Sequence, residues 1–258
     1  MEISGVPAFD SNYLWVLSSG GRAAVVDPGD AAAVQAHLDA HGLALEAILA
    51  THHHADHVGG VAALAARWKC PVYGPVEPRI AGITHPVREG DRVALGFLGP
   101  AFEVIEVPGH TSSHVAYWQR GEPPRLFCGD TLFACGCGRL FEGTPAQMND
   151  SLAKLAALDP RTLAYCAHEY TLANIAFARA ADPANAALRA REAREKARRD
   201  RGEPTVPMAL AEELETNPFL RCATPGVREA AERHAGRALA GPVDVFATIR
   251  EWKNRFPS

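Results

Sequence analysis

The chain places five potential metal-binding side chains in six consecutive positions, and this cluster limits the folds that it can adopt. The run from His52 to His57 contains four histidines and one aspartate. It follows Thr51 and Ala47–Ala50, an apolar run that predicts the end of a short strand. Converging imidazoles and carboxylates are costly to bury unless something binds them, and a metal ion is the simplest partner. The cluster therefore favours a sheet whose strand ends carry a metal site.

Three more predicted strands each lead into a histidine or an aspartate. Residues 102–107 are followed by His110, residues 126–128 by Asp130, and residues 163–166 by His168. Ends of neighbouring strands lie on one edge of a sheet, which is where α/β folds build their sites. We therefore expect these side chains to converge with the cluster.

Alternation along an extended backbone divides the cluster itself. His52 and His54 are two residues apart and point to one side of the chain, whereas His53 points to the other. Asp56 and His57 lie past the strand, at the start of the next helix, and can reach a different point. We therefore expect four of the five side chains to bind metal and His53 to stay outside the site.

The number of ligands predicts two ions. A catalytic zinc ion takes three protein ligands and a water, whereas seven ligands suit two ions about 3.5–4 Å apart. We expect zinc, with iron or manganese as alternatives that also accept imidazole and carboxylate. The seven residues divide into the bridging carboxylate Asp130, a first set of His52, His54 and His110, and a second set of Asp56, His57 and His168.

The remaining pattern predicts an α/β domain followed by helices. Strands are expected at residues 12–17, 23–27, 92–98, 102–107, 114–119, 126–128 and 162–166, and helices at 30–42, 58–68 and 144–158. From Thr171 to Phe256 the periodicity is helical, without a convincing strand. We therefore divide the chain into domains 1–170 and 171–258.

Composition and charge exclude several classes of function. The 258 residues carry a net charge of -4, which gives no support to nucleic-acid or membrane-surface binding. The dense charge run at 189–201 favours a solvated helix face, with Glu192 pairing with Lys196 and Glu195 with Arg199. We expect no signal peptide and no membrane span. The six cysteines lack disulfide-scaffold spacing, so we expect reduced thiols and a cytoplasmic protein. Cys135-Gly-Cys137 predicts a tight loop, and His114 a packing or supporting role.

The metal-binding frame resembles the metallo-β-lactamase superfamily. It comprises Thr51-His52-x-His54-x-Asp56-His57, Gly109-His110-Thr111, Gly129-Asp130-Thr131 and His168. Further motifs resemble glyoxalase II, the hydroxyacylglutathione hydrolases: residues 135–143, 167–171 and 217–221, and the terminal Arg250-x-x-Lys253. The resemblance covers essentially the whole chain. It implies a four-layer αββα sandwich followed by a C-terminal all-helical domain that helps to bind glutathione.

The resemblance also implies an activity, the hydrolysis of S-D-lactoylglutathione to D-lactate and glutathione. A hydroxide that bridges two metal ions would attack the thioester carbonyl, oriented by Asp56 and Asp130, and a metal ion would stabilise the oxyanion. The leaving thiolate has a pKa of about 8.5 and needs little acid assistance. We expect the anionic substrate to contact Arg139, Phe141, Tyr170, Arg250 and Lys253. Some members carry tyrosine where Phe141 stands, so that one contact is changed here.

Three alternatives remain open at the level of sequence. A sulfur dioxygenase of the same superfamily would oxidise glutathione persulfide with a single iron, but the helical tail with Arg250 and Lys253 argues against it. A nuclease would require a basic groove. A non-catalytic binding protein would be expected to lack a metal ligand, and none is missing. We therefore expect an enzyme that acts as a monomer on a small-molecule glutathione thioester, with no nucleic-acid or membrane partner.

Overall fold

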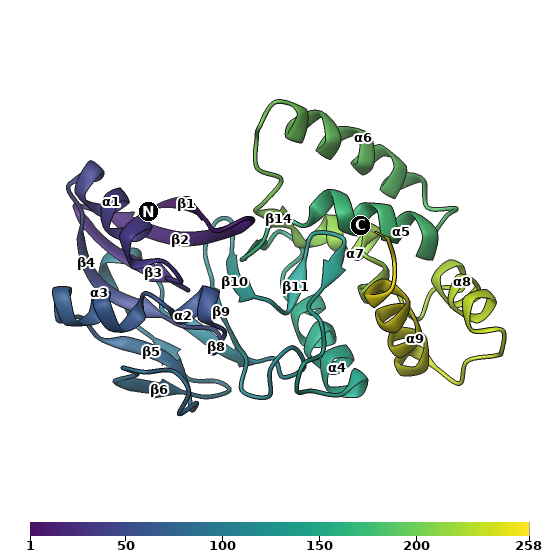
Figure 1. The fold of residues 1–258 in the computed structure, drawn as a ribbon, viewed down its shortest axis with the longest axis horizontal. Helices are drawn as coiled ribbons and strands as arrows, with labels where there is room; N and C mark the ends of the chain where they lie inside the picture. The colour runs from purple at the N-terminus through teal and green to yellow at the C-terminus, as the bar shows by residue number, and fades with distance from the viewer. Residues whose placement is uncertain (258) are drawn as a thin grey trace. The chain divides into compact units, whose positions relative to one another are not determined.

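The computed structural model describes residues 1–257 and forms two compact units. Unit 1 contains residues 1–106 and 113–129, and unit 2 contains residues 107–112 and the chain from Asp130 onward. The last residue of the expected 171–258 domain, Ser258, lies outside the described residues. Figure 1 shows the elements of both units, coloured from purple at the N-terminus to yellow at the C-terminus.

Unit 1 is built on a six-stranded sheet covered by helices. Strands β1 to β3 pair antiparallel, and β3 to β6 continue in parallel. Helices α1 and α3 pack on this sheet, and Val34, Leu38, Val61 and Leu64 bury their side chains in its core. The elements are β1 (Glu2–Ala8), β2 (Asn12–Ser19), β3 (Arg22–Val26), α1 (Ala31–His41), β4 (Ala44–Leu49), α2 (Ala55–Val58), α3 (Val61–Trp68), β5 (Val72–Pro75) and β6 (His85–Val87).

A second group of strands completes unit 1. It runs β10-β9-β8-β7 with antiparallel pairing throughout. Tyr117, on β9, donates a hydrogen bond to the carbonyl of Ala50, just after β4, so the two groups of strands contact each other. The elements are β7 (Arg92–Val93), η1 (Gly96–Leu98), β8 (Phe102–Glu106), β9 (Val115–Gln119) and β10 (Arg125–Gly129).

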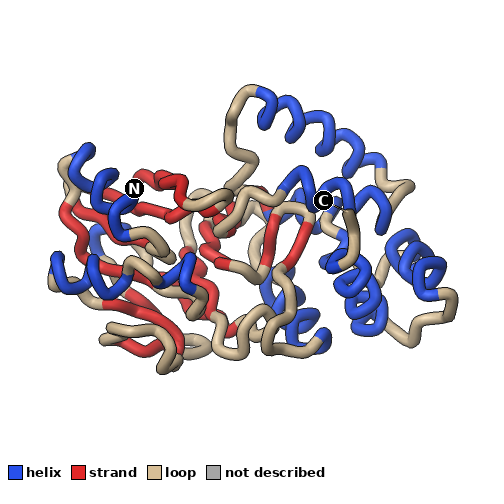
Figure 2. Tube along the Cα trace, viewed as in Figure 1, coloured by secondary structure: helices blue, strands red, loops and turns tan. Residues whose placement is uncertain are grey.

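Unit 2 is mainly helical, with two short strand pairs (Figure 2). Strand β11 pairs with β12 in a hairpin, and β13 pairs with β14. The elements are β11 (Leu132–Phe133), β12 (Gly136–Cys137), α4 (Pro145–Ala156), β13 (Leu163–Cys166), α5 (Thr171–Ala181), α6 (Ala186–Asp200), β14 (Met208–Ala209), α7 (Leu210–Thr216), η2 (Pro218–Leu220), α8 (Pro225–Ala235) and α9 (Pro242–Asn254). Among the described residues, no helix is both long and apolar enough to cross a membrane.

Local chemistry explains where the predicted helices begin and end. Asp30 accepts hydrogen bonds from two backbone amides at the start of α1, and Gly42 ends that helix with a φ of 61°. Thr144 and Gln147 form the expected capping box at the start of α4, with Pro145 in the first helical position. These local predictions are confirmed.

Four expectations about the elements are wrong. The helix expected at 58–68 is interrupted, because Gly59 and Gly60 pack against the backbone of the loop at 28–31. Within the strand expected at 92–98, only Arg92 and Val93 form a strand, and a 3-10 turn begins at Gly96 and ends before Gly99. Strand β14 lies in the region where only helices were expected. Strands β1, β5 and β6 were not predicted.

The charge run of α6 is also less solvated than expected. Arg191 is only 1% exposed and forms an ion pair with Glu213. Glu195 is buried and contacts Arg194 and Arg198, and Glu192 contacts Arg179 on α5. The Arg191–Glu213 and Glu192–Arg179 ion pairs therefore join α6 to α7 and α5, whereas Glu195 pairs within α6 with partners other than the predicted Arg199.

Candidate metal centre and substrate pocket

Unit 1 brings four of the predicted ligands together in the loop after β4 and in the short helix α2. His52 Nε2 lies 3.1 Å from His54 Nδ1, and His57 Nε2 lies 3.5 Å from Asp56 Oδ2. The rings of His52 and His57 have centroids 4.0 Å apart. Both side chains are fully buried.

Asp27 orients this cluster, and the sequence analysis missed it. The residue follows β3, has a left-handed φ of 52°, and is buried. One carboxylate oxygen accepts from the backbone N–H of Thr51 at 2.7 Å. The other accepts from Thr51 Oγ1 at 2.7 Å and faces His57 Nδ1 at 3.0 Å. Asp27 ends the strand expected at 23–27, so it stands at a strand end as the predicted ligands do.

These hydrogen bonds assign the protons on two of the histidine rings. Thr51 donates its hydroxyl proton to Asp27, so its oxygen has to accept from His52 Nδ1, 3.0 Å away. His57 Nδ1 likewise donates to Asp27. The Nε2 atoms of His52 and His57 therefore carry lone pairs, which is the state that a metal ligand requires. The chemistry of the donor set thus fits a divalent cation.

The residues around the cluster include side chains that support the predicted ligands. Asn12 is buried at the start of β2 and donates to Asp56 Oδ2 at 2.9 Å. His114 is fully buried and stacks on the ring of His52, which agrees with a packing role. His53 lies 3.9 Å from Glu77, whereas His52 contacts Thr51 and His54. Asn12 carried no recognisable signal, because its partner is 44 residues away.

Unit 2 brings together the other three predicted ligands. Asp130 directs one carboxylate oxygen toward each of two histidines. Its Oδ2 lies 3.4 Å from His110 Nε2, and its Oδ1 lies 3.4 Å from His168 Nε2. All three residues are buried. A carboxylate with its two oxygens facing different imidazoles has the geometry that a bridging ligand requires.

The backbone after the β11–β12 hairpin holds His110. The carbonyl oxygen of Arg139 lies 2.8 Å from His110 Nδ1, so this nitrogen donates and Nε2 carries the lone pair. Gly138 packs so closely that an added Cβ would overlap the carbonyl of Asp130 and approach the ring of His110. This passage of chain therefore requires glycine at position 138.

One pocket in unit 2 contains two of these ligands and every residue predicted to bind substrate. Its volume is about 550 Å³, large enough for a small molecule. Tyr170 stacks on His168 with ring centroids 4.7 Å apart, and Phe141 meets His110 edge-on at 5.3 Å. The pocket is lined by His110, Asp130, Phe133, Cys137, Arg139, Phe141, Tyr170, Ala173, Asn174, Arg250, Lys253, Asn254 and Phe256.

The two cations of α9 are not on a solvated, frayed helix. Arg250 is 5% exposed, donates to the carbonyl of Cys137 at 2.8 Å, and lies over the ring of Phe219. Lys253 donates to the carbonyl of Ala173 at 2.9 Å. Burial, together with the nearby charges of Arg250 and Arg139, lowers the pKa of Lys253 to about 8. Two cations that repel each other in one pocket are suited to an anionic ligand.

The cysteines are poor candidates for metal binding. All six lie among the described residues, are buried and form no disulfide bond. Burial raises the pKa of Cys135 and of Cys166 to about 12, so both remain thiols at neutral pH, whereas a metal ligand has to be a thiolate. Cys135 lies in the expected tight turn, between β11 and β12.

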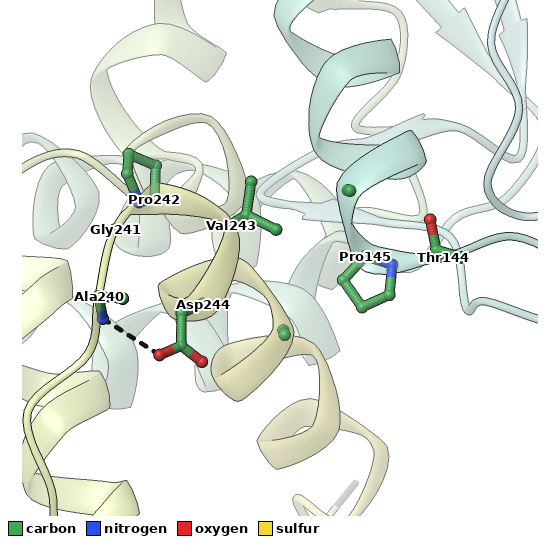
Figure 3. Close-up of a pocket in the computed structure, with 9 residues that line it drawn as sticks. Thr144, Pro145, Ala240, Gly241, Pro242, Val243 and Asp244 are labelled. Carbon is green, nitrogen blue, oxygen red and sulfur yellow. Dashed lines mark hydrogen bonds between the residues drawn. The ribbon is translucent and has the colours of Figure 1, made fainter.

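A second hollow of unit 2 has a different character. It opens between the first turns of α4 and α9 and has a volume of about 590 Å³ (Figure 3). Asp244 is the only charged residue in its described lining, and that carboxylate accepts from the backbone of Ala240 and from Arg237. The hollow therefore offers no group for chemistry.

Comparison with known proteins places the chain in a class of folds. Residues 7–168 match the metallo-beta-lactamase superfamily. ETHE1 from Myxococcus xanthus shares 26% identity and a TM-score of 0.68, with 100% of this chain and 92% of that chain covered. TTHA1623 in a di-iron-bound form shares 26% identity and a TM-score of 0.61, with 85% and 100% covered. The chain is thus a metallo-β-lactamase superfamily protein.

The C-terminal region and the full-length relatives identify the family within this superfamily. Residues 169–256 match the hydroxyacylglutathione hydrolase C-terminus. A hydroxyacylglutathione hydrolase from Dechloromonas aromatica (strain RCB) is 52% identical over 269 residues, which cover 99% of this chain and 100% of that protein. This chain belongs to the hydroxyacylglutathione hydrolase family. The predicted fold class, a metallo-β-lactamase sandwich followed by a helical C-terminal domain, is confirmed, although the short strand β14 departs from the expected all-helical character. A hydrolase is supported over the persulfide dioxygenase.

Proposed function

We propose that this protein hydrolyses S-2-hydroxyacylglutathione thioesters, with S-D-lactoylglutathione as the reference substrate and D-lactate and glutathione as products. One observation carries the proposal. Cationic groups suited to a peptide carboxylate share a pocket with His110 and Asp130, two of the predicted metal ligands. An anionic thioester held by Arg250 and Lys253 would thus present its reacting end to metal-binding groups.

The proposed cofactor is a pair of divalent ions, zinc first, with iron or manganese as alternatives. Support comes from within each unit: lone pairs on His52 and His57 in unit 1, and the two-sided carboxylate of Asp130 in unit 2. In this proposal Asp130 would help to hold both ions, the first with His52, His54 and His110, and the second with Asp56, His57 and His168. TTHA1623, a relative in fold, has been solved with two irons, which is consistent with a dinuclear centre.

The side chains have separate tasks in the proposed reaction. Bound divalent ions would supply a water of lowered pKa and an electrophile for the thioester carbonyl. Asp130 and Asp56 orient the attacking oxygen through their carboxylates, and Asn12 holds Asp56 by donating to its Oδ2. Glutathione leaves as a thiolate of pKa about 8.5, so no side chain has to donate a proton to it.

The substrate-binding residues act at the remote end of the molecule. Lys253 and Arg250 would attract the glycine carboxylate, Arg139 would add a third positive charge, and Tyr170 would offer its hydroxyl and ring edge. Phe141 is exposed and contributes apolar contact without a hydroxyl. In this arrangement residues 1–170 supply the catalytic domain, and residues 171–258 supply a helical substrate-binding domain.

We also propose that the protein is a cytoplasmic monomer whose only partner is its small-molecule substrate. Its six cysteines are free thiols, as is usual in a reducing compartment. The net charge of -4 disfavours nucleic acid and anionic membranes as partners. Light scattering of the purified protein measures the oligomeric state directly, and a dimer would contradict this part of the proposal.

The test of the proposed function is thiol release from S-D-lactoylglutathione, followed with a thiol reagent and paired with metal analysis of the same sample. We expect turnover together with two metal ions per chain. Full activity with one ion per chain would show that the dinuclear assignment is wrong. Oxygen consumption with glutathione persulfide, without thioester hydrolysis, would show that the dioxygenase is the correct alternative.

A further inference from the structure

The β11–β12 hairpin lies in the chain between Asp130 and Arg139, which both line the pocket in unit 2. It begins two residues after Asp130 and ends two residues before Arg139, with Ala134 and Cys135 at its turn. Strands of two residues form little internal hydrogen bonding, so a hairpin this short has to be stabilised by its surroundings. The groups that stabilise it come from the helices.

Side chains far along the chain bind the backbone of this hairpin. Asn217, at the end of α7, directs Nδ2 to the carbonyls of Phe133 and Gly136 at 3.2 and 2.9 Å. Glu213 accepts from the backbone N–H of Cys135 at 2.8 Å. Asn174, on α5, donates to the carbonyl of Ala134 at 3.1 Å.

These three side chains form one buried group, which we call the hairpin clamp: Asn174, Glu213 and Asn217. Asn217 also donates to Glu213 at 2.9 Å, and Arg191 neutralises the buried carboxylate of Glu213. Asn217 and Glu213 are fully buried. A buried carboxylate is costly unless it is paired and hydrogen-bonded. The partners of Glu213 therefore fix the position of its side chain.

The hairpin transmits this geometry to two of the predicted metal ligands. Just after β12, the N–H of Gly138 donates a hydrogen bond to the carbonyl of Thr131, the residue after Asp130. The next carbonyl, of Arg139, accepts from His110 Nδ1 at 2.8 Å. A shift of the hairpin would therefore rotate the ring of His110 and displace the backbone next to Asp130.

We propose that the hairpin clamp is a set of positioning residues for the metal centre, acting through the hairpin on His110 and Asp130. The helical region would then orient metal ligands as well as binding substrate. The inference rests on the proposed function in taking His110 and Asp130 as metal ligands. It predicts that damage to the clamp weakens metal binding even though no clamp residue contacts the metal.

The test is Asn217→Ala in the full-length protein, with zinc affinity measured by chelator competition. Loss of a partner that orients a ligand typically weakens metal binding by about tenfold or more, and we expect that range here. Hydrogen exchange of the peptide spanning residues 131–138 should also accelerate. Unchanged zinc affinity together with unchanged exchange would overturn the inference.

Asn185→Ala is the matched control. Asn185 is also an asparagine of the helical region, and its Nδ2 donates to the carbonyl of Glu215 at 2.8 Å while its Oδ1 caps α6. Among the described residues it makes no hydrogen bond to the hairpin, so its loss should lower thermal stability without changing zinc affinity. Equal zinc losses in both variants would show that general destabilisation is the cause and that the inference is wrong.

Asn174→Ala covers the case in which Asn217→Ala does not fold. It removes one hydrogen bond to the hairpin turn, and we expect a smaller loss of zinc affinity, with the same acceleration of exchange. Wild-type zinc affinity in a folded Asn174→Ala protein would contradict the proposal. Thioester turnover by the wild type tests the proposed function separately, because zinc affinity and hydrogen exchange are measured without substrate.

Discussion

The two groups of predicted metal ligands are held in different ways. In unit 1, His52, His54, Asp56 and His57 come from one six-residue segment and are oriented mainly by Asp27 and Thr51. In unit 2, the ligands come from three separate segments and depend on a hairpin that helical side chains hold in place. A compact motif therefore needs few orienting contacts from outside, here mainly the carboxylate of Asp27, whereas a dispersed one takes its geometry from several elements of the unit.

The largest effect is expected at Asp130, where His110 and His168 converge. Asp130→Ala removes a predicted ligand and leaves two buried imidazoles without their shared carboxylate. We expect loss of metal and of nearly all activity, beyond the roughly hundredfold typical of an orienting partner. Metal content and thiol release measure both effects. His53→Ala is the control and should keep metal and activity; an inactive His53→Ala would place that residue in the site.

The next effect tests the contiguous motif of unit 1. Asp27→Asn keeps the shape of the side chain but replaces one acceptor oxygen with a donor, so Thr51 and His57 lose their preferred proton arrangement. We expect zinc affinity to fall about 10- to 100-fold, measured by chelator competition. Asp30→Asn retains the helix cap and should leave zinc affinity unchanged. Full affinity in Asp27→Asn would mean that the motif does not need this orienting carboxylate.

A smaller effect separates substrate binding from metal binding. Lys253→Met removes one charge from the pocket, and a charge-assisted hydrogen bond is worth roughly 1.5–3 kcal/mol, so we expect KM to rise about tenfold or somewhat more. Contacts to a remote carboxylate are equal in ground and transition states, so kcat should change little. Arg250→Ala should raise KM similarly, but it also removes the donor to Cys137 and is therefore the less specific variant.

A substrate whose glycine carboxylate is capped as an amide sharpens this comparison. If Lys253 binds that carboxylate, the KM penalty of Lys253→Met should be much smaller for the capped substrate. Equal penalties with both substrates would show that the lysine does not contact the carboxylate.

The smallest effect concerns pH. Burial lowers the pKa of Lys253 to about 8, so the side chain is charged below that pH and loses its charge as pH rises through it. KM for the anionic thioester should therefore increase on the alkaline side of pH 8 and approach that of Lys253→Met. Lys253→Arg keeps its charge throughout this range. A KM profile that is equally steep in wild type and Lys253→Arg would assign the titration to another group.

Local patterns account for the features that could be predicted from the sequence. The capping box of α4, the ends of α1 and the β2–β3 hairpin depend on residues a few positions apart. All five predicted substrate-binding residues also line one pocket. Prediction failed where the chain approaches itself closely, as at Gly59 and Gly60, because the loop that interrupts the helix there is about thirty residues away in sequence.

The sequence by itself determined which residue types stand at the strand ends, and the family motifs that name the class of enzyme. Only the tertiary structure decided which groups orient them. Asp27, Asn12 and the hairpin clamp act through hydrogen bonds between residues tens of positions apart; Glu213 and Cys135, for example, are separated by 78. Periodicity reports on neighbours within a helix or strand, and such distant pairs leave no repeating trace. The burial of Arg250 and Arg191 follows the same rule, because their partners are supplied by other elements of unit 2.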